Sequence, residues 1–412
     1  MFAIQREVEV QHNLLTRLAD ARKHTDQLLE IVRPEALYSR PIPERHRIVF
    51  YIGHLEAFDW NLFRPRTGIE PFDSKFDQLF AFGIDPVDGG LPSDQPGDWP
   101  SLSEVRGYVD RVRRTVDGAL DRFDDAQLLN VAIEHRLMHG ETLAYMLHQL
   151  PFQDKIFRNG RAERWAGPVE PRMMEIRAGT ATLGNDAGAF GWDNEFEAHS
   201  VRVPAFEIDQ YKVTNGQYLQ FMDAGGYDDE SVWMPEDWTW KKQQSIMRPV
   251  FWKQRSGEWL YRGMFEEVPL PMDWPVYVSH AEASAYARWA GKKLPSEAQW
   301  HRAAEGCESE RFDFERWDPS PVNSASLARS ASNVAGLTGN GWEWTRTVFA
   351  PFAGFEPFPF YPGYSSNFFD GKHYVMKGGS PRTESCMLRQ SFRNWFQPHY
   401  QYVYAGFRCV SE

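Results

Sequence analysis

The chain has 412 residues, with 57 acidic and 45 basic side chains and a formal charge of −12 at pH 7. A chain of this length exceeds one typical hydrophobic core, so two domains are predicted. Because no basic patch offsets the negative charge, nucleic acid and anionic membranes are excluded as partners. An acidic N-terminus, no apolar run of membrane-spanning length and only three scattered cysteines predict a cytoplasmic protein without a signal peptide.

The apolar periodicity of the first 152 residues predicts a bundle of four helices. They are expected at about residues 5–32, 46–63, 101–123 and 125–150. Ser101 and Glu104 form a capping box at the start of the third helix, and Pro151 ends the fourth. The stretch 67–100 is rich in Asp, Gly and Pro and predicts a long loop, and loops of that length are usually functional.

Two histidines stand one helical turn apart on the fourth predicted helix. His135 and His139 occupy positions i and i+4, so both side chains point to the same face. His54 lies in a strongly apolar part of the second helix, where an imidazole without a partner would cost free energy. The pair alone would suit a packed core as well as a metal site. With His54, three buried imidazoles between bundle helices suit zinc, copper, iron or nickel.

The sequence changes character beyond residue 152. The polar stretch 153–172 predicts a linker, and residues 173–412 are rich in Gly, Trp and Pro with short strand-like pieces. Three helices are predicted in this second domain, at residues 214–224, 279–290 and 296–305. The fold class is therefore α+β, with a second domain of irregular aromatic loops around a small sheet, and these loops can line a pocket.

Six short motifs follow one another in the second domain. They are IRAGT (176–180), DQYKVTN (209–215), KLPSEAQW (293–300), NGWEWT (340–345), KGGS (377–380) and AGFR (405–408). In this order they resemble the formylglycine-generating-enzyme-like (sulfatase-modifying-factor) fold, which is C-type-lectin-like. The first domain resembles the DinB-like helical bundle that precedes this fold in the EgtB-type sulfoxide synthases. The resemblance covers nearly the whole chain.

The resemblance implies a chemistry as well as a fold. EgtB-type enzymes bind a non-haem Fe(II) through three histidines, and these match His54, His135 and His139. With O2 as co-substrate they join a chalcogen to the imidazole carbon between the two ring nitrogens of hercynine (trimethylhistidine). Three neutral ligands leave room on the iron for the chalcogen donor, O2 and the substrate imidazole. We expect this centre beside the aromatic domain, in a monomer or a dimer.

Two elements of the second domain match the substrate side of such a site. Asn394 and Trp395 correspond to the family's hercynine-binding element, where an amide meets a carboxylate and an indole faces a quaternary ammonium. Core packing is the alternative role of Trp395. The family also places a tyrosine near the iron as proton donor, and both Tyr361 and Tyr364 match it.

Three positions depart from the EgtB pattern. Met138 replaces the glutamine before the second histidine of the pair, so one polar contact to hercynine is absent or supplied by another residue. Phe396 replaces a carboxylate that helps to hold the amino-acid thiol donor. The loop with Asp85 and Asp88 is acidic where users of γ-glutamylcysteine carry arginines, so a dianionic thiol would find little cationic clamp.

A neutral chalcogen donor fits these departures better. The chain resembles the SenA-type selenoneine synthases, close relatives of EgtB that take a selenosugar. Asp85, Asp88 and Phe396 are the expected sugar contacts, although for either aspartate taken alone a plain solvated loop is the more common role. The alternative within the family is an ergothioneine-type enzyme that joins hercynine to cysteine or γ-glutamylcysteine.

Three other classes of protein compete with this interpretation. A zinc hydrolase also uses three histidines, but Arg136 stands where the metalloprotease helix motif needs its glutamate base. A formylglycine-generating oxidase needs a cysteine pair after Gly-Gly-Ser, where this chain has Thr383 and Leu388, with Cys386 out of register. A non-catalytic binding module would keep only the fold and would bind hercynine without its histidines.

Overall fold

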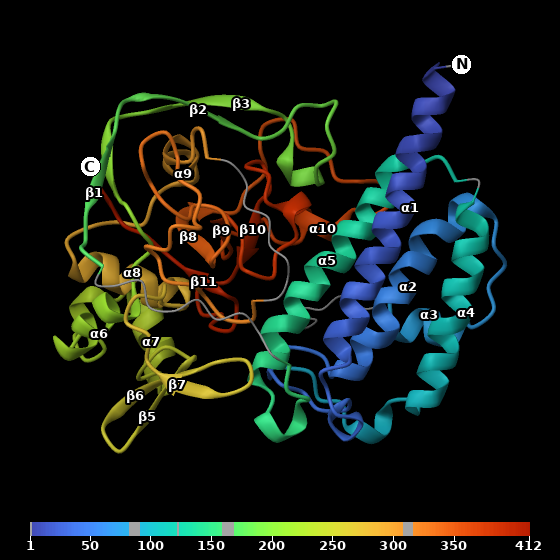
Figure 1. Cartoon of the computed structure of the whole chain (residues 1–412), viewed down its shortest axis with the longest axis horizontal. Helices are drawn as coiled ribbons and strands as arrows, with labels where there is room; N and C mark the ends of the chain where they lie inside the picture. The colour runs from blue at the N-terminus through green and yellow to red at the C-terminus, as the bar shows by residue number, and fades with distance from the viewer. Residues whose placement is uncertain (1, 82–90, 122, 159–168, 308–315) are drawn as a thin grey trace. The chain divides into compact units, whose positions relative to one another are not determined.

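The computed structural model divides the chain into two compact units, Met1–Arg158 and Asn159–Glu412 (Figure 1). It describes residues 2–81, 91–121, 123–158, 169–307 and 316–412, and the side chains from residue 13 onward. Asp85 and Asp88, the expected sugar contacts, lie outside the described residues. No helix in the described part of the chain combines the length and the apolar character needed to cross a membrane.

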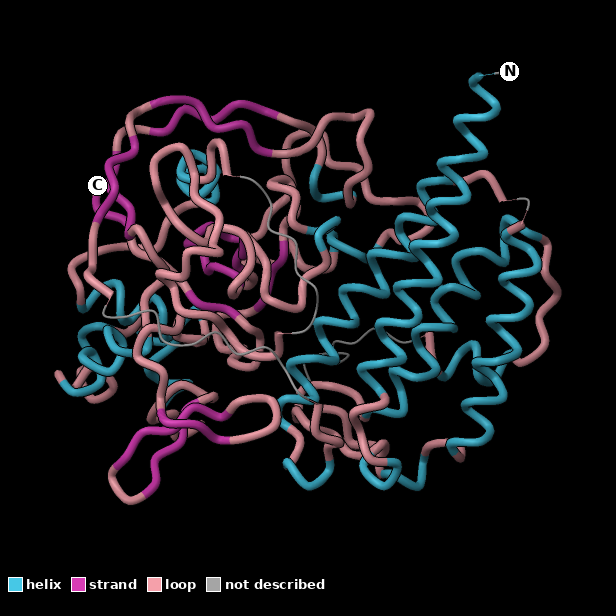
Figure 2. Tube along the Cα trace, viewed as in Figure 1, coloured by secondary structure: helices cyan, strands magenta, loops and turns pink. Residues whose placement is uncertain are grey.

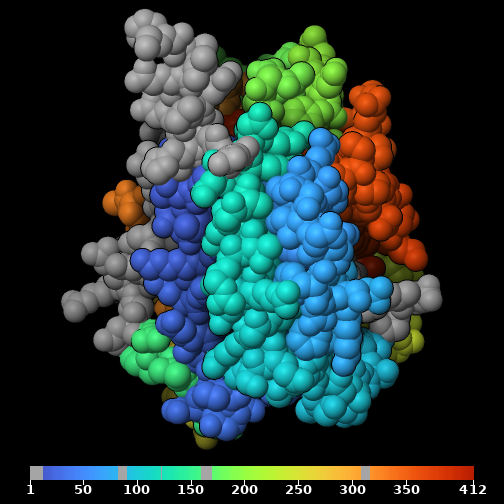
Figure 3. All heavy atoms as spheres, turned by 90° about the vertical axis from the view of Figure 1, so that its right-hand side faces the viewer, coloured from blue at the N-terminus to red at the C-terminus, as the bar shows by residue number. Residues whose placement is uncertain are grey.

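The first unit is built from four long helices, as the apolar periodicity predicted. They are α1 (Phe2–Leu29), α2 (Ile48–Thr67), α4 (Leu102–Leu120) and α5 (Ala126–Gln149). Helix α5 packs against α1 and α2, and α2 packs against α4. An ion pair from Arg22 to Asp117 joins α1 to α4, so contacts link the four helices in a ring. Figure 3 shows the molecule from the side of α4.

Capping residues set the ends of these helices. The Ser101 hydroxyl accepts the backbone N–H of Glu104 at the start of α4, and the Glu104 carboxylate accepts the Ser101 N–H at 2.8 Å. Asp125 caps α5 by accepting the backbone N–H of Leu128. The capping box predicted from the sequence is therefore confirmed.

The described part of the stretch 67–100, expected as a long loop with little secondary structure, is mostly irregular and includes one short helix. The segment contains the helix α3 (Ser74–Leu79) and the 3-10 turn η3 (Pro96–Asp98). Side chains from the long helices hold α3 in place, since Trp60 and Tyr108 both donate hydrogen bonds to Asp77, at 3.0 and 2.8 Å. These tertiary bonds stabilise a helix that is too short to form by itself.

The second unit consists of short strands joined by long loops, as Figure 2 shows. Its sheets have the orders β1-β4-β12, β2-β3, β5-β6-β7 and β10-β9-β8-β11. The strands are β1 (Met173–Ile176), β2 (Gly179–Leu183), β3 (His199–Val203), β4 (Phe206–Asp209), β5 (Trp252–Arg255), β6 (Glu258–Arg262), β7 (Glu267–Pro269), β8 (Trp342–Val348), β9 (Tyr374–Lys377), β10 (Asn394–Phe396), β11 (Ala405–Gly406) and β12 (Val410–Ser411).

In the described part of this unit, five α-helices accompany these strands. The three predicted ones are present as α6 (Asn215–Asp223), α8 (His280–Trp289) and α9 (Glu297–Ala303), each with a capping box. The sequence did not indicate α7 (Pro235–Gln243) and α10 (Gly363–Ser366). Helix α7 lacks an apolar periodicity because its residues are mostly polar or aromatic, and α10 is a single turn.

The sheet around β8 carries the NGWEWT motif and forms the centre of this unit. Trp342 and Trp344 on β8 are buried, and Glu343 between them pairs with Arg408 at 2.8 Å. A buried charge requires such a partner because its desolvation is costly. Strand β10 pairs antiparallel with β9, with Trp395 opposite Val375, which puts the predicted substrate element at the edge of this sheet.

Candidate metal centre and aromatic cluster

The three predicted metal ligands meet in the core of the helical unit. The Nε2 atom of His139 lies 3.1 Å from Nε2 of His54 and 3.1 Å from Nε2 of His135. His54 comes from α2, and the other two come from successive turns of α5. Among the described residues, they are the one group of at least three His, Cys, Asp or Glu side chains with ligand atoms this close, within 4.8 Å of one another.

The surroundings fix both the rotation and the tautomer of His54. Its Nδ1 lies 2.7 Å from the carbonyl oxygen of Phe80, so Nδ1 carries the proton and Nε2 presents a lone pair to the other imidazoles. The Phe50 ring stacks on His54 with centroids 4.8 Å apart, and Phe58 stacks on His135 at 3.4 Å. A ligand histidine typically has such an outer hydrogen bond.

All three imidazoles are neutral near pH 7. Burial lowers the pKa of His54 to about 4, against the pull of its hydrogen bond to Phe80. Burial, followed by the charges of neighbouring histidines, lowers the pKa of His135 and His139 well below 6.5. Neutral imidazole is the form that binds a metal ion. The pocket therefore keeps the three imidazoles in the neutral form that can bind a metal ion, rather than as protonated imidazolium cations.

The spacing of the three nitrogens fits a bound cation. Ligands at right angles on a metal, about 2.1 Å from it, lie about 3.0 Å from each other. The two separations of 3.1 Å are close to this value. Three neutral nitrogen donors at this spacing suit an ion such as iron or zinc.

A buried ion network lies next to the triad on the same two helices. Arg136, adjacent to His135, pairs with Glu56 and Asp59 of α2, each at 2.9 Å, and all three side chains are about 1% exposed. Burial alone would raise the pKa of Glu56, but Arg136 and its neighbouring arginines lower it to about 2. The network fixes α2 against α5 and therefore holds His54 opposite His135.

The sequence did not reveal the part played by Gly53 and Phe80. A Cβ atom on Gly53 would lie 2.5 Å from the Phe80 ring, so only glycine lets Phe80 approach α2 and accept the hydrogen bond of His54. A glycine inside an apolar helix, next to a candidate ligand, was the available signal. Met138, one residue before His139, is half-buried.

The second unit brings three of the predicted substrate residues together. Trp395 stacks on Phe349 with centroids 4.1 Å apart and meets Tyr364 edge-on at 5.4 Å. Tyr364 is 9% exposed, and the half-buried Tyr361 lies 5.5 Å from it. Packing against Phe349 is the core role considered for Trp395. The indole also contacts Tyr364, which in turn contacts Tyr361.

The other two predicted residues of β10 make different contacts. The Asn394 side-chain oxygen accepts the backbone N–H of Trp395 at 2.8 Å, which leaves the amide NH2 group as its remaining donor. The Phe396 ring stacks on Tyr400 with centroids 4.9 Å apart. Phe396 therefore belongs to an aromatic pair separate from the contacts of Trp395.

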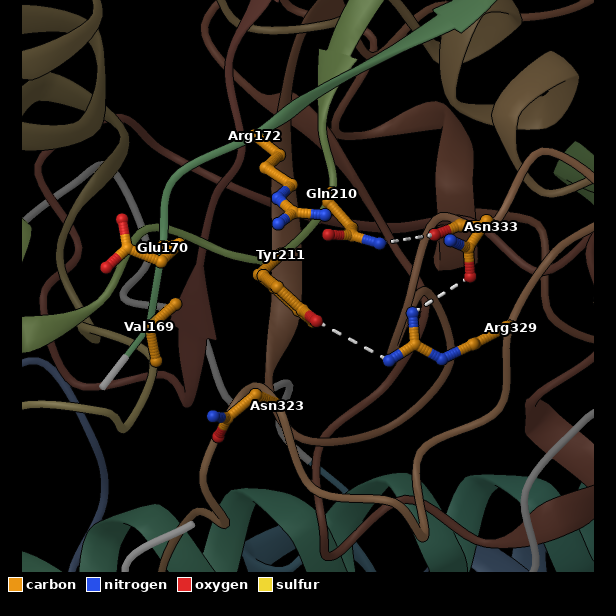
Figure 4. Close-up of a pocket in the computed structure, with 8 residues that line it drawn as sticks. All are labelled: Val169, Glu170, Arg172, Gln210, Tyr211, Asn323, Arg329 and Asn333. Atoms are coloured by element: carbon orange, nitrogen blue, oxygen red, sulfur yellow. Dashed lines mark hydrogen bonds between the residues drawn. The ribbon is translucent and has the colours of Figure 1, made fainter. Parts of the chain in front are cut away.

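A polar pocket elsewhere in the second unit contains none of the predicted site residues, although Gln210 and Tyr211 of the DQYKVTN motif line it (Figure 4). In it, Arg329 donates to the Asn333 side chain at 2.9 Å and approaches the Tyr211 hydroxyl. The lining residues are Val169, Glu170, Arg172, Gln210, Tyr211, Asn323, Arg329 and Asn333.

Comparison with known proteins matches both halves of the chain. Residues 161–412 match the sulfatase-modifying factor enzyme 1-like domain, and residues 17–149 match the DinB superfamily. Hercynine oxygenase of Mycobacterium tuberculosis is 33% identical over 75% of this chain and 78% of its own. The hercynine oxygenase of Mycolicibacterium smegmatis is 32% identical over 97% and 99%. Ergothioneine biosynthesis protein 1 of Neurospora crassa is 26% identical over 93% of this chain and 56% of its own.

Proposed function

The chain belongs to the EgtB-type hercynine oxygenase family, and from this premise we propose that it is a non-haem iron enzyme that joins hercynine to a selenosugar. The observation that carries the proposal is the convergence of three neutral, buried imidazoles from α2 and α5. His54, His135 and His139 would hold Fe(II), which when bound would supply the means to reduce O2. The product would be a selenoxide, the precursor of selenoneine.

The proposed reaction balances with O2 as the only oxidant. The C–H bond of the imidazole carbon between the ring nitrogens and the Se–H bond of the donor are broken, and a C–Se bond forms. One oxygen atom of O2 ends on selenium and the other leaves as water with the two hydrogens. O2 gains four electrons, and the carbon and selenium centres supply them.

The residues of the second unit would bind hercynine and move a proton. The hydrogen bond from the Trp395 backbone N–H uses the side-chain oxygen of Asn394, not its NH2 group. The NH2 group would donate to the hercynine carboxylate. Trp395 would present its indole to the trimethylammonium group. Tyr361 or Tyr364 would give the proton, and the contacts of Tyr364 with Trp395 and of Tyr361 with Tyr364 support this role for the pair.

A neutral donor is favoured by the charge balance of the described helical unit. Arg136, adjacent to His135, pairs with both Glu56 and Asp59, which leaves it poorly suited to clamp a dianionic thiol. The replacements at Met138 and Phe396 remove polar contacts expected for hercynine and for an amino-acid donor. We propose Phe396, with Asp85 and Asp88, as sugar contacts.

The second candidate is the ergothioneine-type reaction with cysteine or γ-glutamylcysteine as the donor. It is favoured by the similarity to hercynine oxygenases, at 33% identity in one relative. The geometry of the triad serves both reactions, because selenium and sulfur donors bind iron through similar ligand sets. The two candidate functions therefore differ only in the chalcogen donor.

The test is a substrate panel with the anaerobically iron-loaded protein. Hercynine and O2 are combined in turn with a selenosugar, a thiosugar, cysteine and γ-glutamylcysteine, and the products are identified by mass spectrometry. We expect the selenosugar to give the fastest coupling. A clear preference for γ-glutamylcysteine would replace the first candidate with the second, and zinc as the bound metal with no O2 consumption would contradict both.

A further inference from the structure

One turn of the second unit contacts both segments that carry the proposed substrate residues. It consists of Trp192 and the 3-10 helix η5 (Asp193–Glu195). All four residues are at most 2% exposed, and Glu195 closes the turn by accepting the Trp192 N–H at 2.8 Å. Two carboxylates in a dry interior require fixed partners, so their contacts define the geometry around them.

The first set of contacts reaches α10, which carries Tyr364 and follows Tyr361. Trp192 stacks on Tyr364 with ring centroids 3.9 Å apart and planes inclined by 26°. The Ser365 hydroxyl donates a short hydrogen bond to the Asp193 carboxylate and accepts one from the Asn194 amide at 2.9 Å. Helix α10 has only four residues and does not hold its own position, so these bonds fix it.

The second set of contacts reaches residues 389–393, which lead directly into β10. Strand β10 carries Asn394 and Trp395. Glu195 accepts hydrogen bonds from Arg389 and from the Ser391 hydroxyl, at 2.9 and 2.7 Å. Arg393 donates to the backbone oxygen of Asn194 at 3.3 Å. The same turn therefore links the tyrosine pair and the hercynine element, which are far apart in the sequence.

We propose that residues 192–195 are a positioning element that sets the tyrosine pair at a fixed distance from Trp395. This inference rests on the proposed function, because it assigns the element to the proton transfer of that reaction. A tyrosine displaced by a fraction of an ångström delivers its proton poorly. Direct oxidation of the donor would then become faster relative to coupling. In that side reaction both atoms of O2 end on selenium, the selenol becomes a seleninic acid and hercynine is unchanged.

The test compares variants by the ratio of oxidised donor to coupled product. Ser365→Ala removes both hydrogen bonds to the turn, and Trp192→Phe weakens the stack on Tyr364. We expect each to raise the ratio about fivefold or more. Asp193→Asn keeps an oxygen that accepts from Ser365 and should keep the wild-type ratio. Because the ratio counts products per turnover, a partly unfolded variant still gives a valid value.

A matched control comes from another buried serine of the same unit. The Ser330 hydroxyl accepts the backbone N–H of Val334 at 3.3 Å, and Ser330→Ala removes that bond without touching residues 192–195. Its ratio should equal that of the wild type. Unchanged ratios in both Ser365→Ala and Trp192→Phe, with coupled product still formed, would overturn the positioning role alone. A wild-type protein without any coupled product would overturn the proposed function with it.

Discussion

The metal-ligand candidates stand on two long helices, whereas Trp395 and Phe396 stand on a three-residue strand and Tyr364 on a single helical turn. In the helical unit, the regular backbone and one ion network fix the positions of the side chains. In the second unit, a third segment, residues 192–195, fixes them through side-chain bonds. A site on long helices is held more precisely, while a site on short elements and loops depends on its supporting contacts.

The largest effect is expected at the triad itself. His139→Ala removes the nitrogen that lies between the other two, so the protein should lose its iron and its coupling activity by on the order of 1,000-fold or more. Metal analysis after anaerobic loading and a product assay measure the two losses. The control is His199→Ala on β3 of the second unit, which should keep both, and an iron-loaded His139→Ala protein would refute the assignment.

The ion network beside the triad should dominate the stability of the helical unit. Arg136→Met leaves Glu56 and Asp59 buried without their main partner, so the free energy of unfolding should fall by about 3–5 kcal/mol. Arg255→Met breaks an exposed pair with Glu267 and should cost less than about 1 kcal/mol. Urea unfolding measures both changes in the free energy of unfolding. Equal changes would show that the ion network does not dominate the stability of the helical unit.

The triad should also give the metal-free protein a characteristic pH dependence. Burial lowers the pKa of His54 to about 4, so between pH 6.5 and 4 the unfolded state binds a proton that the folded state does not. Stability is thus full above about pH 6.5 and falls as the pH drops, by about 3 kcal/mol from His54 alone. His54→Gln should lose correspondingly less over the same range, and identical pH profiles would contradict the buried neutral state.

The smallest effect is expected from Gly53→Ala. The new methyl group meets the Phe80 ring at 2.5 Å, so Phe80 must move and its carbonyl oxygen leaves His54. We expect a loss of about 1–3 kcal/mol in stability and of about tenfold in iron affinity. Gly118→Ala on α4 is the control, since nothing lies within 4 Å of its Cβ, and it should stabilise the helix by about 0.5–1 kcal/mol.

These comparisons also show what the sequence could predict. The i, i+4 spacing of His135 and His139 and the apolar run around His54 were sufficient to predict the triad, because helices turn local spacing into a common face. The hydrogen bond from His54 to Phe80 joins residues 26 positions apart, and that of Asp193 with Ser365 joins residues 172 apart. Such pairs leave no local pattern. The assignment of residues 153–172 as a linker stays a prediction.

The most direct test of the account is anomalous diffraction at the iron absorption edge, on crystals grown with Fe(II) without oxygen. We predict a single strong peak in the helical unit at about 2.1–2.2 Å from Nε2 of His54, His135 and His139. A peak that excludes His54, or iron bound only at another site, would contradict the claim that the two helices build one iron centre.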